Sequence, residues 1–311
     1  MESSDVATAH AGLILQTSAD DGRSAWHFSA FELRAVANKG LGAFARRAYK
    51  CGERLLAEAP LALLVVADRN RVQRSEGKSL IERVVGSLNS RRRAAYYALS
   101  QAEYHGRTPT ALGIWLSNAY PLDEGDEGAG SRQAVFEQIC RINHACAPNV
   151  AITWNAALRK QTVHASRAIA TGEELTASFY GTDGSTGRLR EERQRYFQST
   201  FHFDCACTLC GLTGTKLAQS EARQSRLKAI SQRLEASPAY PVMSKLVLEA
   251  AKLFGEEGLP AAWAKIYYLR LVGGAADAGD AEAAGKWASR AAACARDASG
   301  VDSDAYRAIL Q

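Results

Sequence analysis

The sequence has no apolar run that approaches the roughly 20 residues needed by a membrane-spanning helix. It also lacks the features of a secretory signal. Met1 to Asp21 has no basic opening, and its longest apolar stretch, Ala11 to Leu15, is too short for a signal core. We therefore expect an intracellular protein of the nucleus or the cytoplasm, without a membrane partner, whose thiols are kept reduced.

The chain also lacks a concentrated block of one charge. Its 38 basic and 33 acidic residues leave a net charge of only +5 over 311 residues, and the arginines are mixed with acids. The run from Arg188 to Arg195 predicts a solvated helix face with internal charge pairs. Arg91 to Arg93 likewise predicts an exposed helix face rather than a phosphate clamp. This distribution gives no electrostatic footprint for direct nucleic-acid binding.

The seven cysteines are an odd number, which argues against a complete disulfide framework. Three of them form a C-x-C-x-x-C cluster from Cys205 to Cys210, a crowding that core packing does not explain. A tetrahedral zinc site needs a fourth ligand at about 2.3 Å. Among the other cysteines Cys146 lies in a motif, whereas Cys51, Cys140 and Cys294 do not. Spacing alone favours zinc and leaves redox chemistry and unpaired thiols as alternatives.

Residue patterns predict short strands in the first part and the centre of the chain. We expect these strands near Trp26–Arg34, Asn38–Ala45, Leu55–Ala67 with a break at Pro60, Val150–Ala165 and Leu175–Tyr180. The pattern of Ser79–Glu103 is helical, and its predicted inward face consists of Leu80, Val84, Leu88, Tyr96 and Leu99. Asp123–Gly130 is an acidic, glycine-rich stretch typical of a loop.

Beyond Gly214 the sequence is rich in alanine and helical in pattern. Breaks at Pro238, at 258–260 and at 278–280 divide it into four or five predicted helices. Trp287, Ala291 and Ala295 recur at i, i+4 and i+8, which predicts packing between helices. Strands followed by a helical tail indicate the α+β class.

Five segments resemble, in the same order, motifs of the SET-domain lysine methyltransferases. They are the G-x-G turn at Lys39–Gly42, the N-A-F-like stretch at Asn118–Tyr120, the N-H-S-C-x-P-N signature at Arg141–Asn149, the G-E-E-L-T segment at Gly172–Thr176, and the post-SET zinc cluster at Phe203–Cys210. Ala145 replaces the serine of the signature. The insert between Ala67 and Asn118 has no cysteine, so the MYND finger of the SMYD branch is absent. This combination resembles fungal SET proteins with a helical tail.

The resemblance implies a mainly β SET fold with a pseudoknot and a helical insert, followed by a zinc-binding post-SET loop and an all-α C-terminal extension. It implies a transferase that uses S-adenosyl-L-methionine to methylate a protein lysine. Carried over by position, the cofactor-binding residues are Lys39, Gly40, Leu41, Asn118, Asn143 and His144, and the zinc ligands are Cys146, Cys205, Cys207 and Cys210. The expected segments are a polar N-terminal stretch (1–25), the SET domain (26–182, with its insert at about 68–135), the post-SET region (183–214) and a helical C-terminal domain (215–311).

The catalytic tyrosines of the family are replaced. The eighth position of G-E-E-L-T-x-x-Y is Phe179, and the position four residues before Cys205 is Phe201. Tyr180 is the nearest hydroxyl, but successive strand residues point to opposite faces, so it substitutes only through a slip or a bulge. The candidate catalytic residues are therefore Tyr180, Phe179 and Phe201.

Three hypotheses follow for the function. The first is an active N-methyltransferase for histone or non-histone lysines. The second is a SET-fold binding module, or pseudoenzyme, that acts through protein–protein contacts. The third is a zinc-held scaffold working through the helical C-terminal domain, where a protein partner is also expected.

Overall fold

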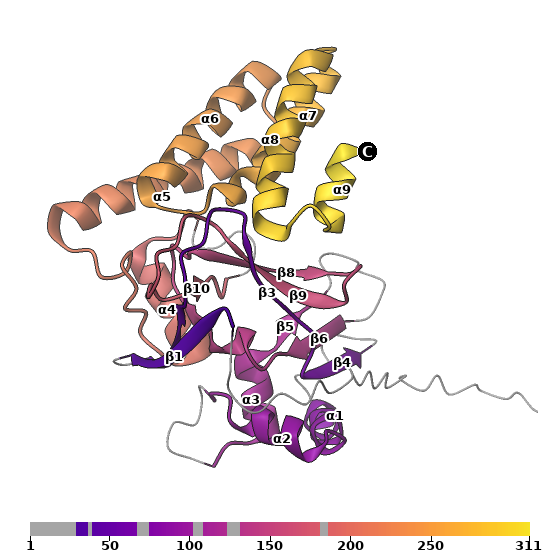
Figure 1. Ribbon diagram of the computed structural model, residues 1–311. Coiled ribbons are helices and arrows are strands. Elements are labelled where there is room, and N and C mark those ends of the chain that lie inside the picture. The colour runs from indigo at the N-terminus through magenta and orange to yellow at the C-terminus, as the bar shows by residue number, and fades with distance from the viewer. Residues whose placement is uncertain (1–28, 37–38, 67–74, 102–107, 123–130, 181–185) are drawn as a thin grey trace, which may run out of the picture. The chain divides into compact units, whose positions relative to one another are not determined.

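The computed structural model describes residues 29–36, 39–66, 75–101, 108–122, 131–180 and 186–311 (Figure 1). The expected polar start and the acidic stretch at 123–130 lie outside these residues. Within these residues the chain divides into two units. One lies between Ala59 and Cys140, and the other consists of Ser29–Glu58 and the described part of Arg141–Gln311. Both combine strands with helices, so the predicted α+β class is confirmed.

The unit of Ala59–Cys140 is a three-stranded antiparallel sheet with helices packed against it. Its strands, in sheet order, are β4 (Ala62–Val66), β6 (Ser131–Val135) and β5 (Tyr120–Pro121). Its helices are α1 (Ser75–Gly86), α2 (Ser90–Tyr97) and α3 (Ala111–Asn118). The core surrounds Tyr96 and Trp115, both buried. Val84, Tyr96 and Leu99 face inward as predicted, and Leu80 and Leu88 are partly buried.

The described residues of the other unit form three small sheets. Strands β1 (Phe31–Val36) and β2 (Gly40–Ala45) form an antiparallel pair, and β3 (Arg54–Glu58), β9 (Lys160–Ala165) and β8 (Val150–Asn155) form a three-stranded antiparallel sheet. Strand β7 (Asn143–His144) pairs in parallel with β10 (Thr176–Ala177). Each predicted segment therefore contains a described strand, with Pro60 lying in the break between β3 and β4. The predicted Leu175–Tyr180 strand is reduced to the two residues of β10, and Trp26–Phe28 lie outside the described residues.

Two segments with similar sequences, 45–53 and 165–173, exchange hydrogen bonds reciprocally. The Ala45 amide donates to the Glu173 carbonyl and the Ala165 amide to the Glu53 carbonyl, both at 2.9 Å, while Tyr49 and Ile169 bond each other in both directions. A glycine with φ near 78° allows each segment to turn in the same place. This exchange fixes where the chain enters β10 and thereby places β10 beside β7.

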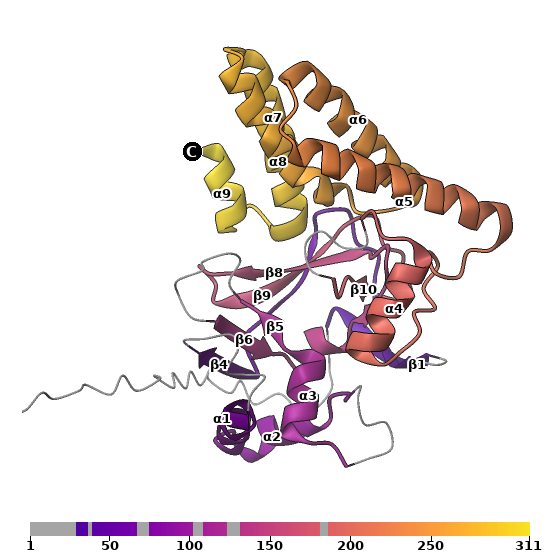
Figure 2. The ribbon, with the colours of Figure 1, turned by 180° about the vertical axis from the view of Figure 1, so that it is seen from behind.

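The remaining helices belong to the same unit. They are α4 (Arg190–Phe201), α5 (Gly214–Glu235), α6 (Tyr240–Glu257), α7 (Lys265–Asp277), α8 (Ala281–Ser299) and α9 (Asp304–Leu310), with short 3-10 turns at Ile139–Arg141 and Ala261–Ala264. Helices α5, α6 and α7 end at the predicted breaks, whereas α8 ends before Gly300, where no break was predicted. Trp287, Ala291 and Ala295 are buried as predicted. Figure 2 shows α4 beside β10, with α5 next to it. No helix in the described ranges has the length and apolar character needed to span a bilayer.

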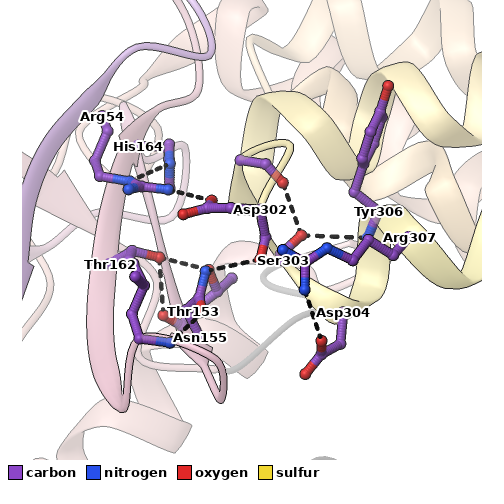
Figure 3. Close-up of polar contacts among 12 residues, drawn as sticks. Arg54, Thr153, Asn155, Thr162, His164, Asp302, Ser303, Asp304, Tyr306 and Arg307 are labelled. Atoms are coloured by element: carbon purple, nitrogen blue, oxygen red, sulfur yellow. Dashed lines mark hydrogen bonds and ion pairs between the residues drawn. The ribbon is translucent and has the colours of Figure 1, made fainter.

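The turn after α8 joins the helical tail to the sheet (Figure 3). Arg54 of β3 forms an ion pair with Asp302, and its Nε donates to His164 Nε2 of β9 at 3.2 Å. Asn155 donates to the backbone carbonyl of Asp302 at 3.3 Å. A Cβ at Gly300 would meet Arg54 and Asp302 at 2.9 Å, so glycine allows the turn to approach this closely. Helix α8 is thus held against β8 and β9.

Acid should weaken the contact between the turn after α8 and the sheet. Burial, reinforced by the Arg54 charge and opposed by Asp302, lowers the pKa of His164 from 6.5 to about 4. The unfolded chain then binds more protons than the folded chain between these values, so the free energy of unfolding falls as pH drops from about 6.5 to 4. For one titrating group, the free energy of unfolding changes by at most ~1.4 kcal/mol per pH unit. His164 therefore lowers this free energy by up to about 3 kcal/mol over the whole range.

The expected result is a flatter pH profile for His164→Asn, which keeps an acceptor for Arg54 but does not titrate. Urea unfolding at several pH values between 4 and 7 measures this slope. The exposed His202, changed to Asn, is the matched control. Equal slopes for the wild type and His164→Asn would contradict the prediction.

Candidate active site and metal centre

Four cysteine side chains converge in the unit that carries α4. Cys146 follows β7, whereas Cys205, Cys207 and Cys210 follow α4. All four are buried free thiols, and their sulfur atoms lie within 4.8 Å of one another. The Cys146 sulfur is 3.9 Å from that of Cys205 and 3.5 Å from that of Cys210. Sulfurs bound tetrahedrally at about 2.3 Å from a metal would be about 3.8 Å apart. The cluster can therefore hold a metal ion of this kind.

Helix α4 fixes the cysteine loop through two neighbouring side chains. Gln194 accepts from the backbone amide of Cys205 and donates to its carbonyl, both at 2.8 Å. Arg193 donates from Nε to the Cys210 sulfur at 3.4 Å and from Nη1 to the Arg188 carbonyl at 2.6 Å. The solvated face predicted for the run 188–195 is wrong for Arg193, which is 0 % exposed. Its Nε and Nη1 donate to sulfur and carbonyl groups instead of water, and its buried Nη2 has no hydrogen-bond partner among the described residues.

Strands β7 and β10 cross the site side by side because Asn149 holds them together. The side-chain oxygen of Asn149 accepts from the Thr176 amide at 2.8 Å, and its nitrogen donates to the Glu174 carbonyl at 2.8 Å. The Ala145 amide donates to the Ala177 carbonyl at 3.0 Å. Through these bonds the Asn143–Cys146 segment is placed between β10 and the cysteine loop.

Three of the proposed cofactor-binding residues lie together around Glu174. Asn143 donates to Glu174 Oε1 at 2.9 Å and to the Leu41 carbonyl at 3.2 Å, and Lys39 reaches Glu174 Oε2 at 3.3 Å. Gly40 has φ near 73° and leaves open space, and the Leu41 side chain is 46 % exposed. A Cβ on Gly42 would stand 2.8 Å from Glu174. This face, defined by Lys39, Gly40, Leu41, Asn143 and Glu174, is accessible at its Gly40–Leu41 edge.

His144 and Asn118 are engaged in internal contacts. His144 is buried, which lowers its pKa from 6.5 to about 4. Its Nδ1 accepts from the Phe179 amide at 3.1 Å, so the neutral ring carries its hydrogen on Nε2, 3.4 Å from the Cys146 sulfur. Asn118 belongs to the unit of Ala59–Cys140, where its amide nitrogen donates to the Ser100 and Ile114 carbonyls, both at 2.7 Å.

Six aromatic side chains form what we call the aromatic wall: Phe179, Tyr180, Tyr196, Phe197, Phe201 and Phe203. All but Tyr196 and Phe201 have ring centroids within 6.4 Å of the His144 ring. The rings of Phe179 and Phe201 are 5.4 Å apart, and Tyr180 stacks on Tyr196 at 4.5 Å. Phe197 is fully buried among them, 4.1 Å from the His144 ring. The two candidate phenylalanines are thus neighbours in this apolar cluster of rings.

The hydroxyl of Tyr180 points to α4. It donates to the Arg193 carbonyl at 3.3 Å, and the Arg188 guanidinium lies 4.8 Å above the ring. Burial raises the pKa of this hydroxyl. The Tyr180 amide donates to Ser178 Oγ at 3.2 Å, so the local turn is fixed. In this geometry the Tyr180 hydroxyl is hydrogen-bonded to α4, while Phe179 faces Phe201.

Sequence reasoning missed several residues that build this site: Glu174, Asn149, Arg193, Gln194, Tyr196, Phe197 and Phe203. Glu174 and Asn149 lie inside motifs that were recognised, so their position was the available signal. Arg193 and Phe197 are separated by one helical turn, but the charged residues around Arg193 concealed their common inward face.

Comparison with known proteins finds a family model that matches the central segment. Residues 40–180 match the family model described as SET domain. The chain is 31% identical over 198 residues to the histone-lysine N-methyltransferase set5 of Schizosaccharomyces pombe, covering 63% of this chain and 56% of that protein. It is 30% identical over 105 residues to the human N-lysine methyltransferase SMYD2, covering 32% of this chain and 22% of that protein. The match therefore spans little more than half of the first relative and about a fifth of the second.

Proposed function

Since residues 40–180 of this chain form a SET domain, as its motifs predicted, we propose that the protein is an S-adenosylmethionine-dependent protein-lysine N-methyltransferase. The supporting observation is the placement of Asn143 and His144. Their strand lies beside β10, between the face around Glu174 and the cysteine cluster. The relatives named for lysine methylation support the same reaction class.

We assign two groups to this chain. S-adenosylmethionine is assigned to Lys39, Gly40, Leu41, Asn143 and His144, with Asn118 as a further contact. Zinc is assigned to Cys146, Cys205, Cys207 and Cys210, because four buried sulfurs at tetrahedral spacing match its preferred ligand set. The segments 1–25, 26–182, 183–214 and 215–311 remain our proposed divisions.

S-adenosylmethionine, when bound, supplies a methyl group on a positively charged sulfur. The residues of the chain have to deliver a neutral lysine amine, although free lysine has a pKa near 10.4. Phe179 and Phe201 supply an apolar lining, and desolvation by such a lining lowers the pKa of an amine. The wall also restricts the direction from which the amine approaches, which is a positioning effect.

The lack of a tyrosine hydroxyl at Phe179 and Phe201 supports a second candidate function. Both family tyrosine positions carry phenylalanine, and the Tyr180 hydroxyl is bonded to Arg193. A SET-fold binding module retaining the cofactor or peptide site, with little turnover, is therefore the alternative proposal. We propose a protein substrate inside the cell for both functions, with a histone or a non-histone lysine bound in the nucleus or the cytoplasm.

Cofactor binding tests the proposal directly. S-adenosylmethionine and its demethylated product S-adenosylhomocysteine should each raise the melting temperature, because a ligand that binds only the folded chain stabilises it by about 2.7 kcal/mol at 100 times its Kd. Asn143→Ala should lose this shift, since it removes the amide that joins Leu41 to Glu174. The exposed Gln198, changed to Ala, is the control on α4.

Calorimetry with both compounds, followed by mass spectrometry of histone and non-histone lysine peptides, separates the outcomes. Binding with methylation supports the enzyme, and binding without methylation of any peptide supports the binding module. If neither compound binds at millimolar concentration, the methyltransferase proposal fails.

A further inference from the structure

Arg193 is the residue through which α4 reaches the cysteine cluster. Its guanidinium contacts the Cys210 sulfur, although the residue stands in a run of charges typical of an exposed helix. Phe197, four residues later, is the other buried residue of α4. Residues at i and i+4 share one face of a helix. Helix α4 therefore presents a cation and an aromatic ring to the interior.

The zinc–thiolate cluster would be the electrostatic partner of the Arg193 guanidinium. Four thiolates around one Zn²⁺ carry a net charge of −2, and a buried charge is costly unless it is paired. The Arg193 nitrogen at 3.4 Å from the Cys210 sulfur supplies one positive charge. The second contact of the guanidinium, to the Arg188 carbonyl, fixes its orientation toward the cluster.

The same residue also touches the aromatic wall. Its backbone carbonyl accepts the hydroxyl of Tyr180 at 3.3 Å. Phe197, on the same face of α4, lies 4.1 Å from the ring of His144 and 4.7 Å from the ring of Tyr180. A shift of α4 at Arg193 would therefore move Phe197 and, on the same helix, Phe201, whose ring lies 5.4 Å from that of Phe179.

We infer that Arg193 is a positioning residue that couples the metal centre to the aromatic wall: its guanidinium is the internal counter-charge of the zinc–thiolate cluster, and its helix carries Phe197 and the acceptor of Tyr180. The inference rests on the proposed zinc site. It adds that the metal sets the position of α4 as well as that of the cysteine loop.

Zinc affinity provides the first test. In the full-length, zinc-loaded protein, Arg193→Met should weaken zinc binding by about 10- to 100-fold in competition with a chromogenic chelator. Arg193→Lys, which keeps the charge, should recover part of that loss. Arg195→Met is the matched control, because Arg195 lies on the same helix with its side chain 71% exposed and pairs with Glu191.

The melting temperature separates lost affinity from damaged packing. Excess zinc should restore the melting temperature of Arg193→Met if weaker metal binding causes its instability, because the metal stabilises the folded state by mass action. Equal zinc affinities for Arg193→Met and Arg195→Met overturn the inference. The inference is also overturned if the melting temperature of Arg193→Met falls, excess zinc does not restore it, and Arg193→Lys shows the same fall. A wild-type protein without zinc overturns the metal site itself.

Hydrogen exchange tests the link to the wall. Removing zinc should speed amide exchange in 176–180 and in α4, because the Phe179 amide is bonded to His144 and α4 is held at the cysteines. Zinc-saturated Arg193→Met should show faster exchange in both segments than zinc-saturated Arg195→Met. Unchanged exchange in 176–180 in both experiments would show that the metal centre and the wall are independent, contrary to the inference.

Discussion

Cys207→Ser should lose the zinc ion and unfold the segment that follows α4. Structural zinc contributes roughly 10–16 kcal/mol in small sites, a value as large as the whole stability of many domains. Cys207 is buried with the other three sulfurs, and the backbone amide of Cys146 donates to its sulfur at 3.4 Å. A serine oxygen at this position offers a poorer zinc ligand than a thiolate, and the remaining three sulfurs no longer enclose the metal.

Metal analysis and thermal unfolding measure this effect. We expect about one zinc per chain in the wild type, little in Cys207→Ser, and a large fall in melting temperature. Cys51→Ser is the control, because this exposed cysteine lies outside the cluster. Wild-type protein purified without chelators that contained no zinc would rule out the metal site.

Phe179→Tyr should raise methylation by on the order of tenfold to a thousandfold, which corresponds to about 1.4–4 kcal/mol at the transition state. The Phe179 ring faces Phe201, so a hydroxyl added there would lie in the apolar lining, at the position that the motif predicts for the family's tyrosine. It would then be available to orient the substrate amine. The rate at limiting lysine peptide, measured by mass spectrometry, reports the change.

Two further variants decide what that result means. Phe203→Tyr adds the same hydroxyl elsewhere in the aromatic wall and should bring no gain. Tyr180→Phe should mainly reduce stability, by about 0.5–1.5 kcal/mol, because it removes one hydrogen bond to Arg193. A large loss of turnover in Tyr180→Phe would instead assign the catalytic hydroxyl to Tyr180. If neither the wild type nor any of these variants methylates a tested peptide, the binding module replaces the enzyme.

The sequence alone determined the features that depend on neighbouring residues. Pro60 lies in a strand break and Gly258 ends α6 because proline removes a backbone donor and glycine tolerates positive φ. The Cys205–Cys210 cluster is equally local, because three sulfurs in six residues remain close in any compact loop. Cys146 was found through its motif, and spacing alone did not select it over the other cysteines.

Only the tertiary structure decided which side of α4 faces inward. Its residues are polar on almost every side, so no apolar stripe marks the position of Arg193. That position became buried because Cys146, 47 residues earlier in the chain, brings the cysteine cluster against the helix. The direction of the Tyr180 hydroxyl and the burial of His164 also depend on contacts between separate segments of the chain. Their partners, Arg193 and the turn at Asp302, come from distant segments that the strand pattern does not reveal. Local propensities set where the elements begin and end, and long-range packing decided which polar groups lost their water and needed a protein partner instead.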